Sequence, residues 1–264
     1  MTEYSASEHS DPYLAQLNQL SALENADPVH YVEALRALTE KGSLNAMNQL
    51  AWAYHHGIGT VVDLTQAERW YRQAGEGGSV SALYNLACIY QERGDDQRAY
   101  EAISAGAAVN DVRCIHTLGL MYRDGRGVAK DREKARELFG RAVEGGSKEA
   151  CHGLASIYWK RKEYKEAYKA LAAGADANDM RCVYWLGRLY RDGQGVERDY
   201  HKARTLFERA SNQGNLFARS ALAILLMSGR CGTRSIVPGL ILYLRTVKDG
   251  FLTCLMNPDR RERW

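Results

Sequence analysis

The sequence has little of what marks a membrane, secreted or zinc-binding protein. Proline occurs only four times in 264 residues, and the longest apolar stretches, 221–227 and 236–244, are too short to span a bilayer. The polar, acidic start of the chain has neither the basic nor the apolar segment of a secretory signal. The six cysteines contain no Cys-x-x-Cys pair, so a zinc site is not expected. We therefore expect a cytoplasmic chain with free thiols, and the sequence leaves open whether a leader has been removed.

Motifs of catalytic and metal sites are lacking as well. The chain has no Gly-x-Ser-x-Gly, P-loop or His-Glu-x-x-His motif. The glycine-rich stretches 125–128 and 193–196 look like phosphate loops, but we interpret them as turns because no strand precedes them. The adjacent pair His55–His56, and the equivalent residues His116 and His152, have no obvious third ligand to complete a metal site. We predict no enzyme activity, no cofactor and no metal.

What the sequence does contain is an internal repeat. The segments 110–146 and 178–214 lie 68 residues apart and share 21 of 37 positions without gaps. A Leu-small-x-x-Tyr motif recurs at spacings of alternately 36 and 32 residues, starting at Leu50, Leu86, Leu118, Leu154 and Leu186. A sixth copy starts at Leu222 and has Leu in place of Tyr. An internal period of this length is typical of a stacked-repeat solenoid.

Each repeat is predicted to be a hairpin of two helices. A small residue in the second helix is followed four positions later by a large apolar one, which places both on one helical face. The large residues are Tyr71, Ile103, Phe139, Leu171, Phe207 and Tyr243. Each repeat closes on Gly or Asn, residues that tolerate the left-handed conformation at a helix end, and these are Gly78, Asn110, Gly146, Asn178, Gly214 and Gly250. Asp63, Asp131 and Asp199 are predicted N-caps of the second helices that follow the longer loops.

The repeats set the predicted domain boundaries. Residues 1–41 form a polar N-terminus and a capping hairpin, with one helix over 13–23 and another starting at Asp27-Pro28. Residues 251–264 form a C-terminal cap or tail, in which a seventh first helix begins after Gly250 and is stopped by Pro258. Between them lie six repeats, 42–78, 79–110, 111–146, 147–178, 179–214 and 215–250.

The pattern Leu-Gly-x-x-Tyr-x-x-Gly-x-Gly-Val-x-x-Asp-x-x-Lys-Ala at 118–135 and 186–203 resembles the Sel1-like repeat, and the shorter repeats resemble tetratricopeptide repeats. The resemblance implies an all-α, right-handed α-solenoid of about six hairpins with capping helices. It also implies an adaptor or scaffold, often bacterial, that holds a protein or peptide in a concave groove lined by first helices.

By analogy with the tetratricopeptide fold, the groove positions of the first helices carry aromatic, histidine and arginine side chains. We predict partner contacts at Asn48, Trp52, His55, Tyr84, Arg113, His116, Arg123, His152, Trp159, Arg181, Tyr184, Arg188 and Arg191. Arginines bind carboxylates through paired hydrogen bonds, so we expect an anionic or acidic-aromatic partner segment. The alternative for Arg123 and Arg191 is that each braces the Arg-Asp-Gly turn of its own repeat.

Other functions stay open from the sequence. One alternative is an immunity protein or adaptor that sequesters a bacterial toxin or effector. Another is a helical-repeat RNA reader, which the net charge of +3 and the alternating repeat length disfavour. The very apolar sixth repeat is either covered by the C-terminal segment or exposed as a surface for self-association.

Overall fold

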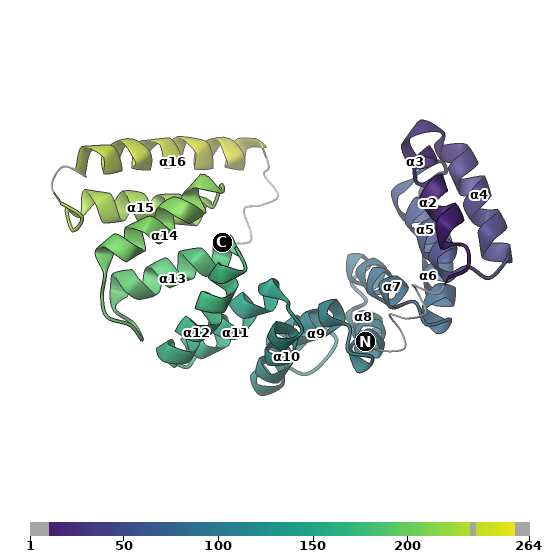
Figure 1. The fold of residues 1–264 in the computed structure, drawn as a ribbon, viewed down its shortest axis with the longest axis horizontal. Coiled ribbons are helices and arrows are strands. Elements are labelled where there is room, and N and C mark those ends of the chain that lie inside the picture. The colour runs from purple at the N-terminus through teal and green to yellow at the C-terminus, as the bar shows by residue number, and fades with distance from the viewer. Residues whose placement is uncertain (1–10, 233–235, 257–264) are drawn as a thin grey trace. The chain divides into compact units, whose positions relative to one another are not determined.

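The computed structural model describes residues 11–232 and 236–256, and this part of the chain folds into helices joined by short turns (Figure 1). It divides into two compact units, Met1–Gly145 and Gly146–Trp264, which we call the N-terminal and C-terminal units. Successive helices pack as antiparallel pairs, and each pair packs against the next within its unit. The fold is the predicted all-α, right-handed α-solenoid.

The N-terminal unit contains a cap and three repeat hairpins. The cap comprises α2 (Leu14–Leu20), α3 (Leu23–Ala26) and α4 (Pro28–Glu40). The hairpins are α5 (Leu44–His56) with α6 (Leu64–Glu76), α7 (Val80–Glu92) with α8 (Asp96–Ala108), and α9 (Val112–Asp124) with α10 (Arg132–Glu144).

The C-terminal unit contains three further hairpins. They are α11 (Lys148–Lys160) with α12 (Tyr164–Asp176), α13 (Met180–Asp192) with α14 (Tyr200–Asn212), and α15 (Leu216–Met227) with α16 (Ile236–Met256).

The helices begin where the sequence predicts. The side chains of Asp63, Asp131 and Asp199 accept hydrogen bonds from backbone N–H groups in the first turns of α6, α10 and α14, which confirms them as N-caps. The predicted closing residues from Gly78 to Gly214 have positive φ, and Asn110 and Asn178 are the two asparagines among them.

The second glycine of each long loop lies where there is no room for a side chain. A Cβ atom at Gly59 would lie 1.8 Å from the carbonyl oxygen of Pro28, and one at Gly127 would lie 1.9 Å from that of Asp96. Both glycines also have positive φ. Each loop therefore packs its backbone directly onto the N-terminal end of the preceding repeat's second helix.

The core follows the predicted pairing of large and small residues. The large residues from Tyr71 to Phe207 in this series are at most 1% exposed. Gly119 leaves room for the ring of Phe139, which a Cβ atom there would approach to 2.9 Å. Close approach of the two helices in a hairpin is thus achieved by removing side-chain volume from the first helix.

A second volume exchange joins neighbouring hairpins. Cys114 is fully buried and occupies a position held by alanine in most other repeats, and the residue opposite it is Gly106. At the equivalent positions one repeat earlier, Ala82 and Ala74 are both fully buried. Glycine opposite cysteine therefore replaces alanine opposite alanine with little change in total volume.

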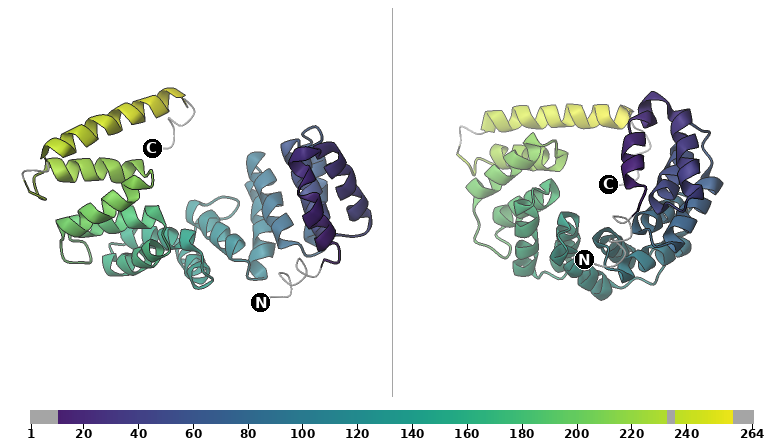
Figure 2. Two further views of the ribbon diagram at one scale, coloured as in Figure 1. Left: turned by 45° about the horizontal axis from the view of Figure 1, so that its top comes forward. Right: turned by 45° about the vertical axis from the view of Figure 1, so that its right-hand side comes forward.

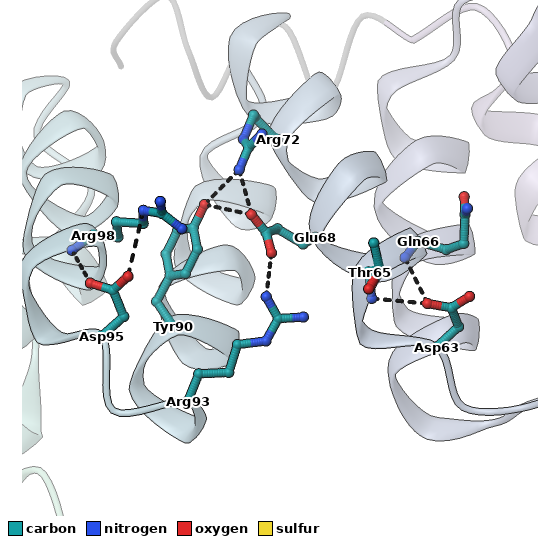
Figure 3. Close-up of polar contacts among 9 residues, drawn as sticks. All are labelled: Asp63, Thr65, Gln66, Glu68, Arg72, Tyr90, Arg93, Asp95 and Arg98. Atoms are coloured by element: carbon teal, nitrogen blue, oxygen red, sulfur yellow. Dashed lines mark hydrogen bonds and ion pairs between the residues drawn. The ribbon is translucent and has the colours of Figure 1, made fainter.

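In the N-terminal unit, the motif tyrosine of each repeat contacts the helix that precedes its hairpin. Tyr54 accepts a hydrogen bond from Arg36 at 2.7 Å, and the hydroxyls of Tyr122 and Tyr100 lie 2.9 Å apart. Tyr90 donates to Glu68 at 3.2 Å, and the same carboxylate accepts from Arg72 and Arg93 (Figure 3). In the N-terminal unit, the first helices α5, α7 and α9 are thus each tied to the helix that precedes them.

Both ends differ from the sequence predictions. The predicted helix over 13–23 is wrong, because α2 ends at Leu20 and α3 starts at Leu23. The Ser21 hydroxyl donates to the carbonyl oxygen of Asn18 at 2.7 Å, which competes with continued helical bonding. At the other end, α16 continues through Gly250 to Met256 instead of closing there. Pro258 and the rest of the tail lie outside the described residues.

The sixth repeat also departs from the predicted core. Tyr243 is expected to be buried like Phe207, but its side chain is 40% exposed. Gly239 and Leu242 instead contribute the side of α16 that packs on α15. Within residues 11–232 and 236–256, no helix has the length and apolar character needed to cross a membrane.

Candidate functional site

The predicted contact residues all lie on first helices. In the N-terminal unit they belong to α5, α7 and α9, and in the C-terminal unit to α11 and α13. Trp52, Arg113 and Arg181 are exposed, and the other predicted residues are partly buried. The two sets therefore belong to different units.

In the N-terminal unit, polar contacts connect the first helices of adjacent repeats. His55 Nε2 lies 3.0 Å from a carboxylate oxygen of Glu92, and the amide of Asn85 donates to Asn48 at 3.1 Å. Trp52 is 43% exposed and stacks on the ring of His56 with 3.7 Å between centroids. An exposed indole held in place by a neighbouring ring is the kind of rigid apolar anchor that protein interfaces use.

The remaining predicted residues of this unit lie on α7 and α9. The Arg113 guanidinium lies 5.4 Å from the ring centre of Tyr84 and donates to the Ser81 hydroxyl at 3.2 Å. His116 packs against Phe139, with 5.8 Å between ring centroids. The exposed Arg113 thus forms a cationic-aromatic pair with the partly buried Tyr84, whereas His116 is directed at the core of its own hairpin.

Two of the predicted arginines are paired with the next residue in the chain. Arg123 donates two hydrogen bonds to Asp124 at 2.8 and 2.7 Å, and Arg191 donates two to Asp192 at 2.7 and 2.9 Å. The hydrogen bond from Arg123 lowers the pKa of Asp124. These contacts favour the turn-bracing alternative for both arginines, because their charges are already matched.

Arg181 is also paired. It donates to Asp179, the N-cap of α13, at 3.0 Å. Burial alone would raise the pKa of the Asp179 carboxyl, but the hydrogen bonds from Arg181 outweigh burial, and the pKa is lowered. Arg181 therefore helps to cap α13, and its charge is already partly neutralised by Asp179.

Arg188 has a different environment. Its guanidinium carbon lies 4.4 Å from the ring centre of Trp185 and 5.2 Å from that of Trp159. The two indoles meet edge to face with 4.9 Å between centroids. Among the described residues, no carboxylate pairs with Arg188, in contrast to Arg181 and Arg191.

A pocket opens beside these indoles. Its volume is about 180 Å³, and it is lined mainly by apolar atoms of α11, α12 and α13. The lining residues are His152, Ala155, Ser156, Trp159, Lys160, Leu171 and Trp185. The aromatic surface extends beyond the pocket, because Tyr184 lies 5.6 Å from Trp185 and 6.2 Å from the ring of Phe217 on α15. We call Trp159, Trp185, Arg188 and the adjoining pocket the tryptophan–arginine site.

Two residues of this surface are absent from the predicted contacts. Trp185 directly precedes the motif Leu186, a position that the groove analogy does not include. Phe217 falls on a groove position, but it lies in the sixth repeat, where no contacts are predicted. Tryptophan is rare enough that its occurrence on two neighbouring first helices is a usable signal. Among residues 11–232 and 236–247, no group of three potential metal-binding side chains comes together.

The paired helices, loop glycines and volume exchanges define an α-solenoid of tetratricopeptide-like hairpins. A family model for the Sel1 repeat matches residues 44–79, 80–101, 113–147 and 181–215. The chain is therefore a Sel1-repeat protein. Such proteins generally mediate protein–protein interaction, and the fold is typically a non-catalytic scaffold.

Two solved structures share this fold over most of the chain. A protective antigen of uropathogenic Escherichia coli is 25% identical, with a TM-score of 0.83 over 94% of this chain and 56% of that one. A Sel1 repeat protein from Oxalobacter formigenes is 25% identical, with a TM-score of 0.75 over 90% of this chain and 99% of that one.

Curated relatives are similar over a smaller part of their length. The ERAD-associated E3 ubiquitin-protein ligase component HRD3B of Arabidopsis thaliana is 28% identical over 45% of this chain and 20% of that protein. Chitin synthase regulatory factor 2 of Schizosaccharomyces pombe is 28% identical over 52% of this chain and 30% of that protein. The chain thus spans less than a third of these two relatives.

Proposed function

We propose that this chain is a protein-binding scaffold, and that its tryptophan–arginine site takes up an apolar side chain and a neighbouring carboxylate of a partner segment. The observation that carries the proposal is the position of Arg188, which lies against two indoles beside an apolar pocket and has no carboxylate partner among the described residues. The proposed partner is an acidic peptide segment rather than a folded surface.

The chemistry of the site supports this ligand. A guanidinium packed on aromatic rings keeps its plane fixed, so its N–H edge is preorganised for two hydrogen bonds to one carboxylate. The cation–aromatic contact itself contributes roughly 0.5–2 kcal/mol, which favours retention of the stacked position when the carboxylate binds.

The size of the pocket also supports a peptide. Its volume of about 180 Å³ is below the range of roughly 300–1,000 Å³ that is usual for small-molecule sites. A single apolar side chain would fit such a pocket, with the backbone of the segment running along α11 and α13. Buried aromatic and arginine anchors of this kind commonly provide most of the affinity of an interface.

The predicted residues of the N-terminal unit are proposed as further partner contacts. Trp52 and Arg113 offer exposed aromatic and cationic surface, and the Arg113 guanidinium lies 3.6 Å from the carboxylate of Asp111 without a hydrogen bond to it. Asn48, His55 and His116 are engaged with other side chains of the unit, and we assign them a supporting role. Arg123, Arg181 and Arg191 are assigned the same role, because each donates hydrogen bonds of 2.7–3.0 Å to an aspartate.

Peptide display against the full chain tests the proposal. We expect the selected peptides to contain a large apolar residue next to Asp or Glu. Trp185→Ala and Arg188→Ala should each weaken binding of a selected peptide by about 30-fold, as expected for interface anchors. Arg188→Lys should lose most of the affinity, because lysine keeps the charge but not the planar pair of donors.

The matched control is Arg136→Ala, which removes an exposed arginine of the N-terminal unit. It should leave peptide binding unchanged. Peptides that bind equally well to wild type and to Trp185→Ala would place the binding surface elsewhere and refute the assignment.

A further inference from the structure

The last helix of the described chain is unusual in length and in what it exposes. The repeat helices α5–α14 each have 13 residues, whereas α16 has 21. It lies along α15 in all views (Figures 1 and 2). The contact is close, since a Cβ atom at Gly239 would lie 2.7 Å from the backbone nitrogen of Met227. One side of α16 is therefore firmly packed.

The opposite side of α16 carries large apolar residues. Seven side chains between residues 236 and 247 are 40–66% exposed, and these are Ile236, Val237, Leu240, Ile241, Tyr243, Leu244 and Val247. Five of them, Val237, Leu240, Ile241, Leu244 and Val247, follow a spacing of three and four residues along the helix. We call these five residues the α16 stripe.

The position of α16 in the repeat array explains why a stripe is there. Within the C-terminal unit, the second helices α12 and α14 each pack against the first helix of the same hairpin and that of the next one. For α16, the principal neighbour is α15 alone. The α16 stripe is thus on the surface where a helix of a next hairpin would pack.

We propose that the α16 stripe is a homodimer interface, in which α16 of one copy packs antiparallel against α16 of a second copy. The spacing of three and four residues is that of helix seams which interlock with a like helix. A two-fold interface needs only one self-complementary surface, and a neutral apolar stripe is complementary to itself. Arg245 is the one charged residue between 236 and 247, and it lies off the stripe.

The exposed area is in the range that a dimer requires. The five side chains of the stripe, each about half exposed, present roughly 500 Å² per copy, or roughly 1,000 Å² in a dimer, which is the size of a weak, concentration-dependent interface. A membrane surface is a poorer occupant, because helices that lie in the lipid interface carry a strongly basic polar face. A second copy of the chain is the occupant that the pattern favours.

Mass measurement by light scattering of the full chain tests the inference. The wild type should shift from monomer to dimer as its concentration is raised over roughly a hundredfold range. Leu240→Glu with Leu244→Glu should raise the dimer dissociation constant by at least about 30-fold, because each copy would place two negative charges in an apolar seam. The milder Leu244→Ala should give an intermediate value.

The matched control is Ile224→Glu, which changes an apolar residue on α15 that is 52% exposed and lies outside the stripe. It should leave the dimer intact. Circular dichroism of each variant checks that the helices are retained. A wild type that stays monomeric at every concentration, or a dimer that Ile224→Glu breaks and the stripe variants do not, would overturn the inference.

Discussion

The contact between Gly106 and Cys114 allows a test that separates the effect of side-chain packing on stability from the effect of helix propensity. A Cβ atom at Gly106 would lie 2.4 Å from Cys114 Sγ, but 3.1 Å from Cys114 Cβ and 3.4 Å from a methyl of Val80. The sulfur atom is therefore the main obstacle to alanine at this position. At the equivalent positions one repeat earlier, alanine occupies both sites, and both alanines are fully buried.

The expected magnitudes follow from this geometry. Gly106→Ala should gain about 1 kcal/mol from helix propensity and lose about 1–3 kcal/mol from overpacking, so we expect it to destabilise the chain. Cys114→Ala removes one buried heavy atom and should cost about 1 kcal/mol. The double variant recreates the alanine pair and should be about as stable as wild type, which corresponds to a coupling energy of about 2 kcal/mol.

Urea unfolding of the four full-length proteins, followed by circular dichroism, measures this cycle. The double variant should unfold at a higher urea concentration than Gly106→Ala alone. If the two single effects instead add within about 0.5 kcal/mol, the sulfur does not occupy the space that alanine needs, and the volume-exchange account is wrong.

Two further predictions concern a carboxylate and the cysteines. Glu68 is mostly buried and accepts hydrogen bonds from Tyr90 and two arginines (Figure 3). Glu68→Ala should therefore lower the free energy of unfolding by about 1–3 kcal/mol, measured by thermal or urea unfolding. Glu133→Ala, which removes an exposed ion pair, should have a smaller effect. An equal loss in both variants would contradict the special role of Glu68. Burial raises the pKa of Cys114, so its thiolate fraction at pH 8 is far below that of a free thiol, and iodoacetamide should modify it only after unfolding. Half-buried Cys231 should react with iodoacetamide in the folded chain, at a rate that rises with pH. Rapid modification of Cys114 in the folded chain would refute the description of its packing.

The repeat architecture could be predicted from sequence because its determinants are local. Capping aspartates such as Asp131, closing residues such as Asn110 and core residues such as Phe139 recur at fixed spacing, and each acts within its own hairpin or on the next. The predicted helix boundaries are wrong where the helices depart from the repeat register. The repeat spacing places a closing residue at Gly250, but glycine inside a helix costs only about 1 kcal/mol, and α16 continues through it.

The candidate site could be predicted only in part, because the state of each side chain depends on its neighbours. Sequence places Arg188 and Arg191 equally well in a groove, yet one stacks on tryptophan and the other pairs with Asp192. The contribution of Trp185 depends on its contact with Trp159, which lies 26 residues earlier on another helix. Pairings between repeats of this kind have no fixed sequence signature.

The central claim is that Arg188 binds a partner carboxylate, and calorimetric titration of a display-selected peptide tests it most directly. The peptide and its Glu→Gln or Asp→Asn analogue are each titrated into wild type and into Arg188→Ala, which makes a double-mutant cycle across the interface. The account predicts that loss of the peptide's charge weakens binding to wild type by about tenfold or more and has little effect on Arg188→Ala. Equal weakening for both proteins would show that the carboxylate contacts another residue, and would contradict the account.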